Sequence, residues 1–435
     1  MYHIYNPGAE TMPAERLRAI QGERLVQTVW RVWDNVPFYR RALEEKGIEP
    51  GDIRSLDDLT KLPFTNKQDL RDNYPFGLFA VPMDEVVRVH ASSGTTGKQT
   101  VVGYTRDDLA VWGEVMARTL GAAGVTRSDT GHISYGYGLF TGGMGGHLGS
   151  ETLGCVTVPA STGNTRRQVT LLQDFRPTFI LCTPSYMLTL IEYMEEHGID
   201  PASLALKTGF FGAEPWTEGM RREIEARAGI TAFDIYGLSE VMGPGVAFEC
   251  EAHEGLHVNE DHFILEIIDP DTGEPVPDGT PGEVCFTCVT KQALPLLRYR
   301  THDIAARIPG ACACGRTLTR ITKPAGRTDD MLIIRGVNVF PTQVEAVLME
   351  LNGTAPFFQL IVEREGNADR LTVLVELTEA MFSDGVRSLE NMSRRVRAAI
   401  ESQLGISVDV RLVEPKTIER TDGKAVRVID RRVLK

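Results

Sequence analysis

The sequence predicts an α/β protein of two domains: a large N-terminal domain with mixed sheets and a β-rich subdomain, residues 1–326, and a small α+β C-terminal domain, residues 327–435. Three observations predict this fold. Short β-rich runs alternate with helical stretches over residues 86–238, an order typical of layered α/β folds. Two strand-like runs with a turn-rich connection follow at residues 264–289. Beyond residue 326, helices and strands alternate in a compact α+β order.

The N-terminal region is predicted to be mainly helical. Leu25, Val29, Val32 and Val36 recur at the three-to-four spacing of one helix face, and Pro37 ends the pattern. We therefore expect scaffold helices here that bury one apolar side.

The remaining elements follow from periodicity and turn residues. The alternating region should contain strands at 179–181 and 208–211 and a helix at 186–197. The β-rich subdomain should contain strands at 264–268 and 283–289. In the small domain we expect a helix at 341–351, strands at 357–363 and 371–377, a helix at 386–404 and a strand at 408–413.

Composition excludes several classes of protein. The 435 residues are 42% hydrophobic and 24% charged, as in a globular protein with an ample core. We find no signal peptide and no apolar run of about eighteen residues, so we expect a cytoplasmic protein without a membrane span. A net charge of −13 argues against nucleic-acid binding, and seven cysteines without a secretory signal indicate reduced thiols or a metal site.

The sharpest local signal is a run of small and hydroxylated residues at 92–98. Small residues let backbone N–H groups approach phosphate oxygens, hydroxyls add donors, and Lys98 adds positive charge. The run is no Walker A loop, because two residues rather than four separate Gly94 from Gly97. The alternative is a plain surface turn. The candidate phosphate-binding residues are Ser93, Gly94, Thr95, Thr96, Gly97 and Lys98.

This run resembles the phosphate-binding loop of the acyl-adenylate-forming superfamily, which includes acyl-CoA ligases, peptide-synthetase adenylation domains and luciferases. Gln99 stands where many members have proline. Further segments similar to that superfamily's motifs follow in the expected order, at 211–215, 236–240, 298–303, 326–330 and 422–424. The resemblance therefore spans most of the chain and implies a large adenylate-forming domain followed by a mobile lid domain.

The resemblance also implies a nucleotide site. Tyr236 would stack on adenine, Asp303 would accept from the ribose hydroxyls, and Arg327 would donate to the sugar or a phosphate. Residues of the 211–215 segment would contact the edge of the base. The complete set of candidates is Gly212, Ala213, Glu214, Asp234, Tyr236, Gly237, Asp303 and Arg327.

Five residues carry the implied chemistry. Glu240 is the candidate ligand for Mg²⁺, and Ser239 would hold the α-phosphate. Lys424 is the candidate cation for adenylation, with a solvated surface lysine as the alternative. Asp329 matches the hinge about which the small domain rotates between the two half-reactions. Gly336 would line the pantetheine path of CoA, unless it is an ordinary turn glycine.

The acid site is predicted from a mixture of aromatic residues and glycines at 135–143, which suits a flat apolar slot. This segment, together with 101–105 and 423–427, resembles the phenylacetate–CoA ligase family in particular. Phenylacetate, substituted benzoates and indole acids all stay open as substrates. The candidate aryl-binding residues are Tyr135, Gly136, Phe140 and Gly212.

A zinc site is predicted from three cysteines and a histidine. Cys250, His257, Cys312 and Cys314 would form a closed tetrahedral site of structural type. His253 is an alternative fourth ligand. Free thiols without a metal are the competing interpretation.

Taken together, the sequence predicts an ATP-dependent aryl-acid–CoA ligase. The acid would react with ATP to an acyl-adenylate and pyrophosphate, and CoA would then yield the thioester and AMP. The implied cofactors are ATP, Mg²⁺, CoA and a structural Zn²⁺, and a homodimer is expected from base rates. Two alternatives stay open: an adenylating enzyme that loads a carrier protein, and a non-catalytic nucleotide-binding regulator.

Overall fold

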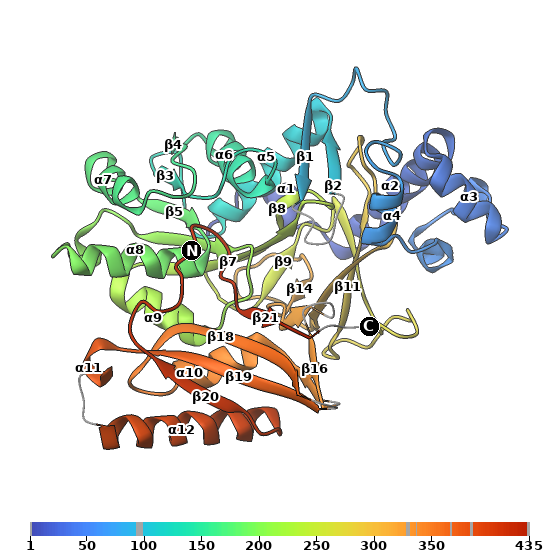
Figure 1. Ribbon diagram of the computed structural model, residues 1–435. Helices are drawn as coiled ribbons and strands as arrows, with labels where there is room; N and C mark the ends of the chain where they lie inside the picture. The colour runs from blue at the N-terminus through green and yellow to red at the C-terminus, as the bar shows by residue number, and fades with distance from the viewer. Residues whose placement is uncertain are drawn as a thin grey trace.

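The chain begins with helices that pack against the larger domain (Figure 1). The computed structural model describes residues 2–92, 99–327, 331–335, 337–365, 368–382 and 386–432. The N-terminal helices are α1 (Pro7–Glu10), α2 (Ala14–Asn35), α3 (Pro37–Glu45) and α4 (Lys67–Asp72), with 3-10 turns at Pro50–Asp52 and Leu56–Lys61. The predicted apolar face of α2 is confirmed, because Leu25, Val29 and Val32 are fully buried. Pro37 ends that helix by opening α3, where its missing N–H costs nothing.

A nine-stranded sheet forms the centre of the large domain and confirms the predicted α/β layering. Its order is β13-β14-β9-β8-β7-β6-β5-β3-β4, with β4, β3, β5, β6 and β7 parallel and the rest antiparallel. The strands are β3 (Thr130–Ile133), β4 (Val156–Val158), β5 (Phe179–Cys182), β6 (Thr208–Gly212), β7 (Thr231–Leu238), β8 (Gly243–Glu249), β9 (Leu256–Val258), β13 (Arg307–Ile308) and β14 (Arg320–Ile321). The parallel strands all end at one edge, where α/β proteins bind ligands.

Helices cover this sheet and connect its parallel strands. Figure 1 shows α5 and α6 above the parallel strands and α8 and α9 below them. The helices are α5 (Arg106–Gly121), α6 (Thr141–Leu153), α7 (Thr165–Phe175), α8 (Pro184–Glu196) and α9 (Glu218–Ala228), with a 3-10 turn at Pro201–Ser203. The predicted helix at 186–197 is thus confirmed as α8.

Two smaller sheets complete the large domain. An antiparallel sheet has the order β10 (Phe263–Ile268), β11 (Gly282–Cys288), β12 (Tyr299–Ala305) and β15 (Gly326–Arg327), which confirms the predicted β-rich subdomain. A hairpin of β1 (Arg88–Ser92) and β2 (Thr100–Tyr104) flanks residues 93–98.

The C-terminal unit is a four-stranded sheet with helices, in the predicted α+β order. The sheet order is β20-β19-β18-β21, and a separate hairpin joins β16 to β17. The elements are β16 (Leu332–Ile334), β17 (Val337–Val339), α10 (Pro341–Met349), β18 (Thr354–Glu365), β19 (Ala368–Leu377), α11 (Glu379–Phe382), α12 (Val386–Leu404), β20 (Asp409–Val413) and β21 (Val428–Asp430). The predicted boundary at residue 326 stays a prediction, since residues 328–330 lie outside the described part.

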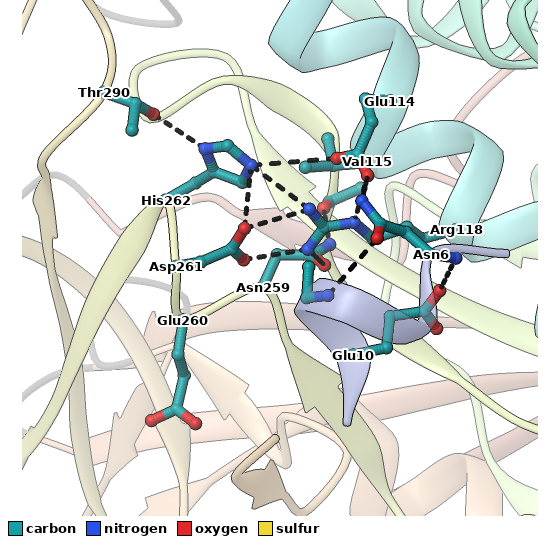
Figure 2. Close-up of polar contacts among 12 residues, drawn as sticks. Asn6, Glu10, Glu114, Val115, Arg118, Asn259, Glu260, Asp261, His262 and Thr290 are labelled. Atoms are coloured by element: carbon teal, nitrogen blue, oxygen red, sulfur yellow. Dashed lines mark hydrogen bonds and ion pairs between the residues drawn. The ribbon is translucent and has the colours of Figure 1, made fainter. Parts of the chain in front are cut away.

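A buried ionic cluster joins α5 to the loop after β9 (Figure 2). Arg118 donates to both carboxylate oxygens of Asp261 at 2.8 and 2.9 Å and to Glu114 at 2.6 Å. Asn6 donates to Glu114 at 2.8 Å, which fixes the N-terminal segment against α5. Removing one partner would leave a buried charge unpaired, so this cluster makes the packing of α5 specific.

None of the helices formed by the described residues has the length and apolar character needed to cross a bilayer.

Candidate active site

Strands β7, β12 and β15 bring three of the predicted nucleotide-binding residues into contact. The Tyr236 hydroxyl donates to Asp303 Oδ2 at 2.5 Å, and Arg327 Nη1 donates to Asp303 Oδ1 at 3.2 Å. Burial raises the pKa of Tyr236 well above its usual value, so the hydroxyl stays a donor. The Asp303 carboxylate is therefore held in one orientation before any ligand binds. Such preorganisation lowers the entropy cost of binding a ligand.

The 211–215 motif lies where β6 ends and approaches β7 closely. A Cβ on Gly212 would lie 2.2 Å from the carbonyl oxygen of Ile235, so only glycine fits there. Ala213 has a positive φ of 68°, a left-handed backbone conformation that changes the direction of the chain after β6. The Glu214 carboxylate accepts from the backbone N–H of Ser185 at 2.9 Å and of Ala425 at 2.7 Å. This carboxylate thus connects the large domain with the segment that carries Lys424.

Ser239 and Glu240 follow β7 and are nearly buried, at 8% and 5% exposure. Ser239 Oγ lies 2.8 Å from Thr141 Oγ1. Glu240 Oε1 accepts from Thr100 Oγ1 at 3.2 Å and lies 3.7 Å from Lys67 Nζ. A buried carboxylate beside hydroxyl groups is a hard oxygen site of the kind that Mg²⁺ prefers.

Lys291 is a buried residue near this site that sequence reasoning missed. Its Nζ donates to the main-chain oxygen of Glu240 at 3.3 Å and lies 4.6 Å from the centre of the Tyr104 ring. Burial lowers its pKa, while neighbouring Cys288, Asp108 and Glu240 oppose that shift. A lone lysine cannot be recognised as functional in a sequence, because most lysines are exposed. Lys291 stands out only in the structure, where its side chain is 2% exposed.

The predicted acid site lies at the end of β3 and the start of α6. Tyr135 is 3% exposed, and burial raises the pKa of its hydroxyl well above the usual value. Phe140 precedes α6 and is 37% exposed, so its side chain is partly open to solvent. A Cβ on Gly143 would lie 2.6 Å from the carbonyl oxygen of Gly136, so the start of α6 packs directly on the loop after β3. The arrangement gives an aromatic wall with glycine backbone beside it.

The segment with Lys424 lies against the large domain. The carbonyl oxygen of Gly423 accepts from Thr183 Oγ1 at 3.0 Å and from Ser185 Oγ at 3.3 Å. Thr183 follows β5 directly, so the segment docks at the carboxyl ends of the parallel strands. Lys424 is exposed and has an electrostatic or hydrogen-bonding partner.

Two further predicted nucleotide-site residues, Asp234 and Gly237, lie on β7, and other candidates fall outside the described part of the chain. The Asp234 carboxylate lies 3.4 Å from Lys323 Nζ, and burial raises its pKa to about 6. Gly237 lies in β7, where a Cβ would be 1.9 Å from the carbonyl oxygen of Gly243. The phosphate-loop candidates at 93–98, the hinge candidate Asp329 and Gly336 lie outside the described residues.

The predicted zinc ligands come together in the structure. Cys250, His257, Cys312 and Cys314 are buried, and their ligand atoms all lie within 4.8 Å of one another. Cys250 Sγ is 3.8 Å from Cys312 Sγ, and Cys314 Sγ is 3.4 Å from His257 Nε2. Tetrahedral zinc with bonds of about 2.3 Å to sulfur and about 2.0 Å to nitrogen requires separations of roughly 3.8 and 3.5 Å. The donor set and its spacing therefore fit zinc.

His257 rather than His253 belongs to this cluster. Its Nδ1 lies 3.3 Å from the carbonyl oxygen of Leu318, which fixes the ring and leaves Nε2 toward the sulfurs. His253 is partly exposed and lies 3.3 Å from Glu249, so the alternative ligand is wrong. Hydrogen bonds from Cys250 and then His257 lower the pKa of Cys314 far below its usual value.

Comparison with known proteins agrees with this geometry. The family model described as AMP-binding enzyme matches residues 4–289, and the model of the AMP-binding enzyme C-terminal domain matches residues 336–432. A phenylacetate-coenzyme A ligase of Aromatoleum evansii is 54% identical, covering 97% of this chain and 96% of that protein. One of Thermus thermophilus is 51% identical over 99% and 100% of the two chains.

A solved 2-hydroxyisobutyryl-CoA ligase is 32% identical to this chain. Its postadenylation structure, with an acyl-AMP, matches with a TM-score of 0.93 over 98% of this chain and 92% of that one. Its thioesterification structure, with the acyl-AMP and CoA, covers 98% and 91% and has a TM-score of 0.72. The domain arrangement here is thus closer to that of the postadenylation structure than to that of the thioesterification structure. The ordered motifs, the Tyr236–Asp303–Arg327 contacts and both family models show that the chain belongs to the AMP-binding enzyme family.

Proposed function

We propose that this protein is an ATP-dependent phenylacetate–CoA ligase. It joins the acid to AMP with release of pyrophosphate, and then transfers the acyl group to CoA with release of AMP. The observation that carries this proposal is near full-length identity of 51–54% to phenylacetate-coenzyme A ligases. Free CoA is favoured over a carrier protein, because these relatives are CoA ligases.

The site residues have distinct roles in the first step. Asp303 and Tyr236 bind the ribose and adenine, Ser239 holds the α-phosphate, and Lys424 stabilises the charge that develops as the carboxylate attacks phosphorus. Glu240 would hold Mg²⁺, which neutralises the triphosphate when bound. The Tyr135 wall and the glycine backbone beside it receive the aryl ring and keep water from the adenylate.

A pyrophosphate-release assay tests the reaction and its substrate. Purified enzyme with ATP and Mg²⁺ is given phenylacetate, hydroxybenzoates, indole acids and short aliphatic acids, and then either CoA or a phosphopantetheinylated carrier protein. We expect the highest kcat/KM with phenylacetate and thioester formation with CoA. Absence of pyrophosphate release with every aryl acid would contradict the proposal, and transfer to the carrier alone would support the carrier-loading alternative.

Asp303→Asn tests the nucleotide site. The substitution keeps the shape of the side chain but removes the charge that pairs with Arg327. We expect KM for ATP to rise by about tenfold, or about 1.4 kcal/mol, the scale of one hydrogen bond to a charged group. Tyr236→Phe is the control, since it keeps the ring and removes only one donor, and a smaller rise is expected. An unchanged KM in the Asp303 variant would argue against the ribose assignment.

We also propose that Cys250, His257, Cys312 and Cys314 bind a structural Zn²⁺. Three thiolates and an imidazole fill a tetrahedral site and leave no open position, so the metal would have no part in catalysis. Metal analysis of protein purified without chelators tests this, with about one zinc per chain expected. Protein that is folded, active and free of metal would contradict the proposal.

A cytoplasmic location completes the proposal. All seven cysteines are buried and free, including the three of the metal cluster. Reduced thiols are the rule in a reducing compartment, which also supplies ATP and CoA. Fractionation of the source cells with activity measured in each fraction tests the location.

A further inference from the structure

The segment that carries Lys424 is held between the two domains by a partly buried arginine, Arg420. Figure 1 shows this last part of the chain, drawn in red, running between α8 and the sheet of the small domain. The Arg420 side chain is 17% exposed. It lies between a carboxylate of each domain, Glu192 on α8 and Glu376 on β19.

The contact with the large domain is a bidentate ion pair between Arg420 and Glu192. Arg420 Nε donates to Glu192 Oε2 at 3.0 Å, and Nη2 donates to Oε1 at 3.1 Å. Paired hydrogen bonds of this kind are stronger and more directional than a single contact. Glu192 is 22% exposed, so solvent screens the pair only in part.

The contact with the small domain holds the same guanidinium in place. Arg420 donates to Glu376 at 2.9 and 2.6 Å, and its Cζ lies 3.3 Å from the centre of the Phe357 ring. The Glu376 carboxylate also accepts from the backbone N–H groups of Lys416 and Ile418. The arginine is thus a fixed part of the small domain, presented to α8.

A change of domain arrangement affects these two contacts differently. Arg420, Glu376 and Phe357 belong to one domain and stay together if that domain rotates. Glu192 belongs to the other domain, so its ion pair exists only while the Lys424 segment lies on α8. This is the arrangement that matches the postadenylation structure more closely than the thioesterification structure.

We propose that Glu192 is a positioning residue for the first half-reaction, because its ion pair with Arg420 favours the domain arrangement that brings Lys424 to the site. This inference rests on the proposed two-step function. A contact made in only one of two arrangements shifts their populations by its own free energy. Losing it should therefore slow adenylation without slowing thioester formation.

The test is Glu192→Gln, measured separately in the two half-reactions. Single-turnover pyrophosphate release with ATP and phenylacetate reports the first, and thioester formation from supplied phenylacetyl-adenylate and CoA reports the second. We expect the first rate to fall about fivefold to tenfold, as for loss of a partly buried charged pair, and the second to stay equal or rise. Glu192→Ala should show the same split.

A matched control lies one turn further along α8. Glu196 also pairs with the Lys424 segment, at 2.5 Å from Lys416 Nζ, but both side chains are exposed, at 41% and 53%. Exposed pairs contribute little, so Glu196→Gln should change either rate by less than about twofold. Thermal unfolding of each variant shows whether the fold is kept.

The outcomes separate the inference from the proposed function. Equal loss in both half-reactions, or no loss in the first, would overturn the role of Glu192. Wild-type enzyme that forms no adenylate from any aryl acid would instead overturn the proposed function. A fall in the first rate alone, in both Glu192 variants and not in the Glu196 variant, would support the inference.

Discussion

Replacing Lys424 by alanine is expected to reduce acyl-adenylate formation by about a hundredfold to a thousandfold, the usual cost of removing one group that stabilises transition-state charge. Thioester formation from supplied phenylacetyl-adenylate should be nearly unchanged, because in that step the thiol attacks the acyl carbon and AMP leaves, with no substitution at phosphorus. Stopped-flow pyrophosphate release and thioester detection measure the two steps.

Lys416→Ala is the matched control for this prediction. Lys416 lies in the same segment, but it pairs with Glu196 at the surface and makes none of the Gly423 docking contacts. We expect less than a twofold change in adenylation. If Lys424→Ala lowered both half-reactions equally, the lysine would be needed for the fold or for both arrangements, and its assignment to the first step would be wrong.

Cys312→Ser is expected to remove the zinc and to lower stability by several kcal/mol, because a metal bound by the folded state alone contributes its binding free energy to folding. The cluster joins the end of β8 to the loop before β14, so both would loosen. For a chain of this size we expect a fall of roughly 5–10 °C in the unfolding midpoint. Metal analysis and calorimetry of the variant check both effects.

Cys155→Ser is the matched control, since Cys155 is also buried and free but lies outside the metal cluster. Its zinc content should equal that of the wild type. A Cys312 variant that kept its zinc and its midpoint would contradict the ligand assignment. Substituting His253 should leave the zinc in place, because its ring is turned toward Glu249.

The order of the motifs predicted which distant segments would meet in a nucleotide site. Tyr236, Asp303 and Arg327 are far apart in the chain, yet each lies in a segment whose residues suit one part of ATP, and the structure brings them into contact. The apolar periodicity of α2 and the alternation of strands and helices were equally visible, because burial imposes a repeat on a sequence. The three-residue strand β21 was missed, since so short a run has no period.

The partners of single charged side chains could not be predicted in this way. The adenine-edge role of Glu214 stays a prediction, and the sequence did not indicate that its carboxylate accepts from Ser185 and Ala425. Lys291 was not predicted at all. In both cases the partner comes from a distant part of the chain, so its identity depends on how the elements pack.

The metal cluster shows the same difference between what the sequence predicts and what depends on packing. The sequence by itself determined the donor types, three thiols and an imidazole, and with the ordered motifs it determined the family and the reaction. Only the tertiary structure decided between the two histidines, because the pairing of β8 with β9 sets Phe248 opposite His257 and brings that ring to the cysteines. Likewise only packing placed Arg420 between Glu192 and Glu376. The chemical type of each residue can be read directly from the sequence. The distance between two charges, and hence their interaction energy, depends on the fold.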